Sequence, residues 1–238
     1  MGEQQHDPEA LASSLRATMA TLVAERAPRP EIATIKQRVR RWQNRRFAHT
    51  YRDLARNPRY RAAIDFFLSE LYGDSDMTAR DTDMARILPM MIKVLPAVAL
   101  QTVRDSLAFE ALSERLDTDL AAQLGSRVLD DTSYGEAFRA CGRRADRESQ
   151  IRCVSEIGHA LDRMTRWPLI RTTLRLMRVP AGAAGLSTLQ AFLEGGYAAF
   201  REMHGAEEFL ATIARRETVI VERLFAGHPR PFELEDTL

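Results

Sequence analysis

The sequence predicts an all-α protein, an irregular or orthogonal bundle of roughly nine or ten helices. Apolar side chains recur every three or four residues in nearly every segment, which is the period of one helix face. No alternating apolar and polar run bounded by turn residues predicts a strand. The chain has 238 residues, 45% hydrophobic and 28% charged, which is typical of a globule with one substantial core.

Residues 1–56 predict a pair of helices, the second of them strongly basic. Asp7 can accept hydrogen bonds from the free N–H groups that open the first helix. The second helix should run from about residue 30 to 56 and bend where its apolar stripe turns. Trp42 and Tyr51 lie on that stripe and need packing partners, so we expect the pair to pack on the rest of the chain.

Residues 57–226 are expected to form the main bundle, followed by a tail at 227–238. We expect a kink or break near Pro89 and Pro96, and a clear break over 179–185. Prolines, glycines and capping residues mark the other ends. The expected helices run from Asn57 to Gly73, from near Thr78, over 97–124, from Ser133 to near Gly142, over 146–167, from Pro168, from Ser187 and over 206–225.

The cysteines and the sequence ends indicate a cytoplasmic protein. Cys141 and Cys153 are too few for a disulfide framework and are expected to be free thiols. The start of the chain is polar, unlike a signal peptide, and no window of 18 apolar residues predicts a transmembrane segment. There is no nucleophile elbow, phosphate loop or dinucleotide fingerprint. Gly195-Gly196 lies inside a predicted helix, where it should permit close helix packing or a kink.

The net charge of +1 is unevenly distributed. Between Arg26 and Arg61 there are twelve Lys or Arg and two acids, or +10, so the remainder carries −9. A stripe of this kind can bind a protein partner, a membrane surface or a nucleic acid backbone. It can also be a solvated face, or pair with acids elsewhere in the chain. The basic stripe on one face of the second helix is formed by Arg38, Arg41, Arg45 and Arg52.

Two constellations could hold a ligand or a metal. Arg80, Asp83 and Arg86 recur every three residues and can share one helix face beside Tyr72. These four residues form either a ligand site or an internal clamp. Glu156-x-x-His159 has the spacing of a helical di-iron motif, but such sites need a second copy and two further carboxylates. We predict no cofactor and retain Glu156 and His159 as the alternative metal site.

One run of residues carries a family resemblance. Residues 66–73 read Phe-Phe-Leu-Ser-Glu-Leu-Tyr-Gly, and this resembles the motif of the bacterial FFLEELY family of uncharacterised proteins, with Ser69 in place of Glu. The resemblance covers roughly residues 60 to 224. It implies a bacterial, helical, cytoplasmic protein and supplies no catalytic residues. Further matching strings are Arg80-Asp81-x-Asp83, Leu88-Pro89-x-Met91, Leu95-Pro96, Gln150-Ile151, Arg178-x-Pro180-Ala181, Ala184-Gly185-Leu186, Leu189-Gln190-x-Phe192-Leu193-Glu194 and Arg216-Glu217.

Together these observations favour a non-enzymatic binding, regulatory or adaptor protein for a protein partner or a small ligand. No acid–base pair, activated nucleophile or complete metal set is assembled in the sequence. Two alternatives stay open. One is an enzyme or a cofactor or metal carrier with a pocket inside the bundle, and the other is nucleic-acid binding through residues 36–52. The sequence leaves the oligomeric state open.

Overall fold

The computed structural model describes residues 7–27, 29–71 and 77–234. Within these ranges the chain is all-α, as predicted, with eleven α-helices, one π-helical turn and no strand. The elements are α1 (Pro8–Glu25), α2 (Pro30–Thr50), α3 (Arg52–Arg56), α4 (Pro58–Phe66), the π-helical turn (Phe67–Leu71), α5 (Met77–Val94), α6 (Ala97–Leu124), α7 (Asp131–Ala140), α8 (Arg144–Thr165), α9 (Pro168–Ala183), α10 (Ser187–Glu202) and α11 (Glu207–Ala226).

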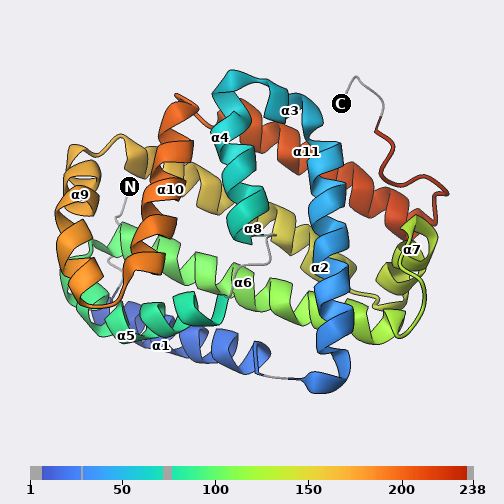
Figure 1. Cartoon of the computed structure of the whole chain (residues 1–238), viewed down its shortest axis with the longest axis horizontal. Helices are drawn as coiled ribbons and strands as arrows, with labels where there is room; N and C mark the ends of the chain where they lie inside the picture. The colour runs from blue at the N-terminus through green and yellow to red at the C-terminus, as the bar shows by residue number, and fades with distance from the viewer. Residues whose placement is uncertain (1–6, 28, 72–76, 235–238) are drawn as a thin grey trace.

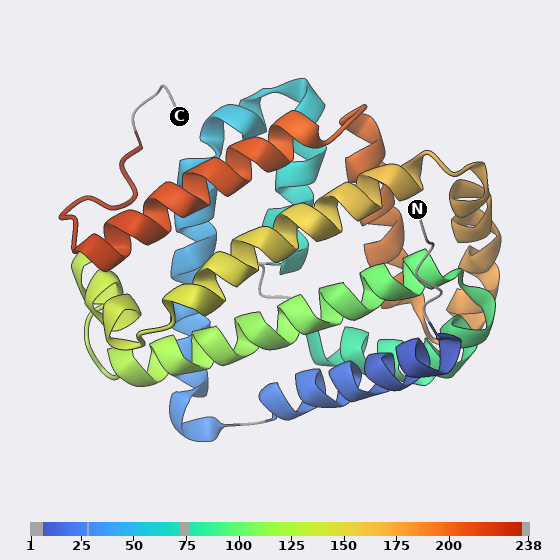
Figure 2. The ribbon, with the colours of Figure 1, turned by 180° about the vertical axis from the view of Figure 1, so that it is seen from behind.

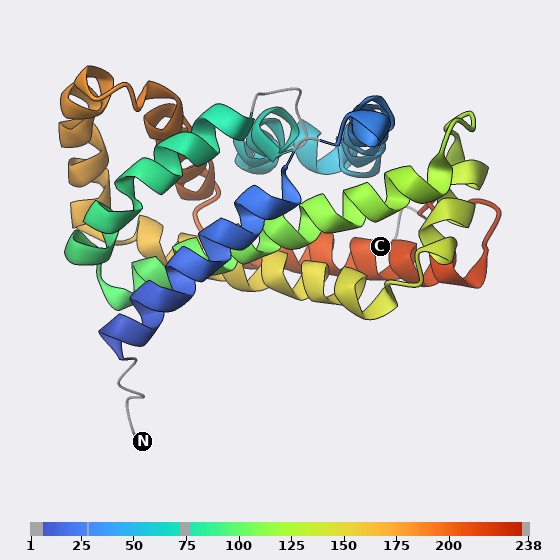
Figure 3. The same cartoon turned by 90° about the horizontal axis from the view of Figure 1, so that it is seen from below.

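The long helices form one layer, and shorter helices cross it. Helix α6, with 28 residues, runs along the molecule, with α1 on one side of it and α8 and then α11 on the other (Figure 2). Helices α2, α4 and α10 cross this layer steeply (Figure 1). They lie on one side of it, together with α5 and α9 (Figure 3). The crossing arrangement is that of an orthogonal bundle.

Three apolar clusters hold the layers together. One joins α1, α5 and α6, a second joins α2, α6, α7 and α11, and a third joins α2, α3, α4, α10 and α11. Trp42 belongs to the second cluster and stacks on Tyr134 with ring centroids 4.0 Å apart. Tyr51 belongs to the third and is fully buried. Both aromatic residues are therefore packed, as predicted, and α2 connects two of the clusters.

Helix α9 corrects the predicted break over 179–185. The helix continues through Pro180 and ends only at Ala183. At its end the Leu186 N–H donates to the carbonyl of Ala181, and Gly185 adopts a φ of +70°. This is a Schellman end, in which a glycine in the left-handed region closes the helix. The glycine, and not the proline, sets the boundary.

Other predicted boundaries also differ. The second helix ends at Thr50 and α3 starts after Tyr51, which accounts for the additional helix. Pro89 lies inside α5, whereas Pro96 does separate α5 from α6. The predicted helix end at Gly73 lies outside the described residues.

Two predicted capping residues are shifted in position. Asp130, not Ser133, caps α7, and its side chain accepts from the backbone N–H of Ser133. Ser133, at the third helical position, accepts in turn from the backbone N–H of Asp130 through its hydroxyl. The two together form a reciprocal capping box. Ser187 is the first helical residue of α10, and the cap position holds Leu186, which has no side-chain acceptor. A capping pattern in sequence thus locates a helix start only to within a few residues.

Candidate functional site

Arg80 lies at the centre of the candidate ligand site, on the first half of α5. It is buried, and its Nη2 atom donates to both carboxylate oxygens of Glu110 at 3.0 Å. Its guanidinium carbon also lies 4.4 Å from the ring centre of Phe192. Arg80 therefore joins α5 to α6 and to α10.

Arg86 extends in another direction from the same helix. Its exposed guanidinium donates to Oδ1 of Asp83 at 3.1 Å and to the carbonyl of Gly185 at 3.4 Å. These contacts link α5 to the turn between α9 and α10. Tyr72, the fourth predicted member, lies outside the described residues. Of the three described members, Asp83 and Arg86 thus pair with each other, whereas Arg80 contacts Glu110 and Phe192 instead.

Arg26 joins Arg80 in a larger group of charged side chains that sequence reasoning did not single out. Arg26 follows the last residue of α1. Its guanidinium donates to Asp81 and Glu110, and its Nε lies 3.3 Å from Oε1 of Glu114. These bonds hold the end of α1 against α5 and α6.

Helices α2 and α6 meet through two rows of polar side chains. Lys36 and Arg40 both pair with Glu114, and Nε of Arg40 lies 3.6 Å from Oδ2 of Asp117. Gln43 donates to Asp117 at 3.1 Å. We refer to all of these residues as the buried charge network. It consists of Arg26, Lys36, Arg40, Gln43, Arg80, Asp81, Glu110, Glu114 and Asp117.

The network is neutral as a whole, because four cations face four carboxylates. Burial alone would raise the pKa of Glu114, but Arg40, Lys36 and Arg26 outweigh it and hold that pKa below its ordinary value. Burial raises the pKa of Asp81, and the hydrogen bond from Arg26 offsets only part of the effect. The charges are matched internally, so the arrangement acts as a connection between helices α1, α2, α5 and α6.

The sequence does contain a signal for this network. On α2, Lys36, Arg40 and Gln43 are separated by four and then three residues. The acidic row on α6, Glu110, Glu114 and Asp117, has the same spacing. Each row occupies one narrow face of its helix. Two complementary rows of equal spacing predict helix pairing, whereas either row alone looks like a solvated face.

The motif that carries the family resemblance is a packing element. Phe66 ends α4, and a Cβ added at Gly196 would lie 3.1 Å from its Cζ atom. The adjacent Gly195 faces the same ring at 3.4 Å. Phe67 stacks on Phe209 with ring centroids 6.0 Å apart. The prediction that Gly195-Gly196 permits close packing is confirmed.

The structure divides the predicted basic stripe, because α2 ends at Thr50 and Arg52 is the first residue of α3. Arg38, Arg41 and Arg45 lie on a different face of α2 from the network. Arg41, Arg45 and Arg52 are exposed. Arg38 is half-buried and donates to the carbonyl of Arg127 at 2.9 Å. Acids from the remainder of the chain also pair with other basic residues of this segment, namely Arg26, Lys36, Arg40, Arg46 and Arg59.

The alternative metal site is not gathered into a cluster. Glu156 is exposed on α8, while Nδ1 of His159 lies 3.5 Å from a carboxylate oxygen of Glu207 on α11. Among the residues that the structure describes, no three His, Cys, Asp or Glu side chains form a group that could hold a metal ion. The contact of His159 with Glu207 is a surface pair between two neighbouring helices.

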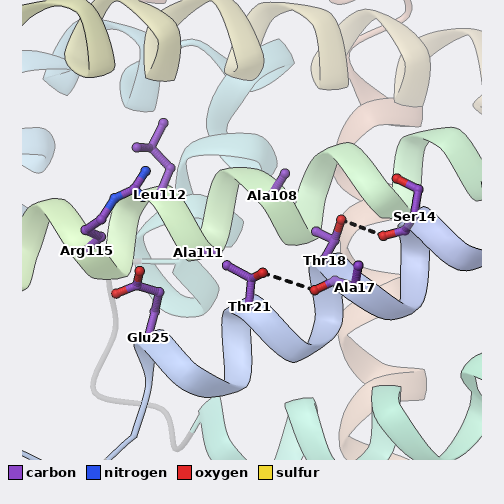
Figure 4. A pocket seen from close by; sticks show the side chains of 9 residues that line it. All are labelled: Ser14, Ala17, Thr18, Thr21, Glu25, Ala108, Ala111, Leu112 and Arg115. Carbon is purple, nitrogen blue, oxygen red and sulfur yellow. Dashed lines mark hydrogen bonds between the residues drawn. The ribbon is translucent and has the colours of Figure 1, made fainter.

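Two shallow hollows open on the surface. The first, of about 280 Å³, lies between α1 and α6 (Figure 4). Its Thr18 and Thr21 hydroxyls donate back to carbonyls of their own helix, so their protons are already used in internal hydrogen bonds. The second, of about 230 Å³, lies between α8 and α11 and includes Ile151 and Val221. Neither hollow contains Arg80, Asp83 or Arg86.

These features define an all-α bundle protein whose central polar residues are used for internal contacts. A family model described as Domain of unknown function (DUF8198) matches residues 22–231. Because this match covers most of the chain, the protein belongs to that family. No curated protein and no solved structure matches the chain. In the described part of the chain, no helix is both long and apolar enough to span a bilayer.

Proposed function

We propose that the protein is a non-enzymatic adaptor of the bacterial cytoplasm and binds an acidic segment of a protein partner through the basic stripe. The observation that carries the proposal is that α2 has basic residues on two different faces. One face of the helix is occupied by Lys36 and Arg40, whose charges are matched by α6. On the opposite side of the helix, Arg41 and Arg45 of the basic stripe are exposed and lie one helical turn apart.

Acidic residues border the stripe, which favours a protein partner over a nucleic acid. The pKa of Asp131 is raised by burial and by its neighbours Asp130 and Glu233, and His49 partly offsets this effect. His49 lies in the last turn of α2, so the end of the stripe adjoins these carboxylates. A phosphate backbone is negative along its whole length and would meet these carboxylates, whereas an acidic protein segment can be short enough to contact Arg41 and Arg45 alone.

The contacts of Arg80 and Arg86 give less support to a small ligand as the binding partner. Arg80 is enclosed by Glu110 and Phe192, and the exposed Arg86 contacts Asp83 and the turn at Gly185. A ligand at this site would have to displace existing ion pairs. The free thiols Cys141 and Cys153 support a reducing setting for the protein.

The experiment uses fluorescent poly-L-glutamate and a DNA duplex of equal charge as probes. Arg41→Glu/Arg45→Glu should weaken poly-glutamate binding by about tenfold or more, because it replaces attraction with repulsion. The matched control, Arg16→Glu/Arg215→Glu, makes the same charge change at two exposed helix positions elsewhere and should leave binding within about twofold.

Either of two results would overturn the proposal. One is equal loss in the stripe variant and the control, because that would show that only net charge matters. The other is tighter binding of the duplex with a steep fall in affinity as salt is raised, which would establish the nucleic-acid alternative. Circular dichroism of each variant verifies that the helices remain folded.

A further inference from the structure

The exposed large apolar side chains are concentrated in two segments of the sequence. Among the described residues, ten large hydrophobic side chains are exposed, and eight of them fall in 84–104 or 163–193. Both segments are free of Asp and Glu, and together they contain seven Arg and one Lys. The eight apolar residues are Met90, Val94, Val98, Trp167, Leu169, Leu176, Val179 and Leu193.

The fold brings these segments to one end of the molecule. Helix α9 is the outermost helix at that end (Figure 1). The C-terminal half of α5 and its connection to α6 lie at the same end when viewed from the front, from behind and from below (Figures 1, 2 and 3). We refer to this surface, formed by α9 and by residues 90–98, as the α9 end. The two segments that carry most of the exposed large apolar residues thus lie at one end of the molecule.

Helix α9 divides its circumference into three faces. Ile170, Leu174 and Met177 are half-buried and turn toward the bundle, where α9 packs on α10. Leu169, Leu176 and Val179 project outward and are 77%, 71% and 81% exposed. A stripe this apolar and this exposed is unusual for a surface helix, whose outer face is normally polar.

The third face of α9 is basic. Arg171 and Arg175 lie one turn apart, are exposed, and make no ion pair in the part of the chain that the structure describes. Arg178 pairs with Glu194 at 2.6 Å, just beyond the acid-free segment. Arg166 pairs with Asp162 at 2.8 Å, just before it. Within the two segments the charged residues are therefore all basic, and acids adjoin the segments at their ends.

We propose that the α9 end docks on the surface of an anionic lipid membrane. Leu, Val and Trp side chains beside a row of arginines are the features of a helix that lies in the plane of a bilayer interface. Anionic headgroups supply negative charge over the whole contact area, which matches a surface that offers cations without acids. The region between the headgroups and the acyl chains can accommodate the exposed apolar side chains of α9 without a preformed groove.

A protein partner fits this end less well than a bilayer. Its surface would have to supply both an apolar groove for the outward stripe and acids for the arginines. Trp167, 36% exposed at the start of α9, adds a side chain that favours the headgroup level. The α9 end is separate from the basic stripe of α2, so this inference stands or falls independently of the proposed function.

The test measures flotation of the intact protein with vesicles of phosphatidylcholine alone or with a fifth of phosphatidylglycerol. The protein should bind the anionic vesicles at least tenfold more tightly than the neutral ones. Leu176→Glu/Val179→Glu should weaken that binding by at least tenfold, and the two positions are exposed enough that folding is retained. Val128→Glu/Val23→Glu, at two other exposed apolar positions, is the matched control and should retain binding.

Fluorescence provides a second readout. Brominated lipid in the anionic vesicles should quench the emission of Trp167, and the Trp167→Phe variant should lose the quenching because Trp42 is buried. Absence of vesicle binding, or equal loss in the Val128→Glu/Val23→Glu control, would overturn the proposal. So would a concentration-dependent dimer that Leu176→Glu/Val179→Glu abolishes, because a second copy of the chain would then cover this face.

Discussion

Nη2 of Arg80 lies 3.0 Å from both carboxylate oxygens of Glu110, so one buried nitrogen holds a whole carboxylate. The pair joins α5 to α6 where Arg26 also binds Glu110. It is part of a neutral network, and removing one member of such a network is strongly destabilising because the remaining partner is left with an uncompensated charge. The stability of variants at Arg80 can therefore distinguish an internal clamp from a ligand site.

Arg80→Ala should lower the free energy of unfolding by about 3 kcal/mol, because it leaves Glu110 short of a buried partner. Arg86→Ala is the control, since its side chain is 54% exposed and its pair with Asp83 should contribute less than about 1 kcal/mol. Urea unfolding followed by circular dichroism measures both. An Arg80→Ala protein that unfolds like the wild type but loses binding of poly-L-glutamate would contradict the clamp.

Glu114→Gln should change how stability depends on pH. Because the folded-state pKa of Glu114 is lowered, its contribution is present above the ordinary Glu pKa and is lost as pH falls through the folded value. The variant should be less stable than the wild type by about 3 kcal/mol at pH 7. This difference in stability should narrow as the pH falls below the ordinary Glu pKa and through the folded-state pKa, as urea midpoints at each pH would measure.

For Asp81→Asn, the stability difference from the wild type should change with pH in the opposite direction to that of Glu114→Gln. The folded-state pKa of Asp81 is raised, so its contribution is present below the ordinary Asp pKa and is lost as pH rises through the folded value. The stability of the wild type relative to this variant should therefore increase on acidification. If the stability differences of Glu114→Gln and Asp81→Asn from the wild type changed with pH in the same direction, the prediction would be contradicted, because the two carboxylates would not differ in their environment.

The all-α fold could be predicted because helix periodicity is local, but the partner of each face could not. Lys36 and Arg38 are two residues apart on α2, yet the first pairs with Glu114 and the second donates to the carbonyl of Arg127. Both look like solvated positions in sequence. Only the crossing of α2 over α6 decides which cations are matched, and that crossing depends on long-range packing.

The sequence predicts helix boundaries well where residues at both ends are incompatible with a further helical turn. It predicts them poorly where a single proline only makes the helix less stable. Helix α6 covers 97–124 as predicted, because Pro96 precedes it and Gly125 follows. Pro89 and Pro180 are instead absorbed inside helices. A proline removes one hydrogen bond, and surrounding contacts can offset this loss, so it marks a helix end less reliably than a glycine with positive φ.

The two cysteines should react slowly with a thiol reagent in the folded protein. Burial raises the pKa of both Cys141 and Cys153, and the thiolate is the reactive form. At pH 8 we expect modification by a disulfide reagent to be several-fold slower than in urea. Single Cys→Ser variants assign each rate, and a native rate equal to that of the unfolded chain would contradict the prediction.

Replacing glycine with alanine should have opposite effects on stability at Gly158 and at Gly182. The difference arises because α8 packs closely on α11 at Gly158. A Cβ at Gly158 would lie 2.9 Å from Cδ1 of Leu210 and closer still to Cδ2, and Leu210 is only 1% exposed. Gly158→Ala should therefore destabilise the protein by about 1–3 kcal/mol. At Gly182 in α9 an added Cβ would meet nothing nearer than Ser187 Oγ at 4.0 Å, so Gly182→Ala should stabilise by about 0.5 kcal/mol.

Leu210→Ala identifies the cause of the effect at Gly158. This truncation removes the atoms that a new Cβ would strike, so Gly158→Ala made in the Leu210→Ala background should cost less than about 0.5 kcal/mol more than Leu210→Ala alone. Thermal and urea unfolding of the two single variants and the double variant complete the cycle. Additive losses would mean that Leu210 is not what excludes a side chain at Gly158, and that α8 and α11 are farther apart than the packing of these two residues requires.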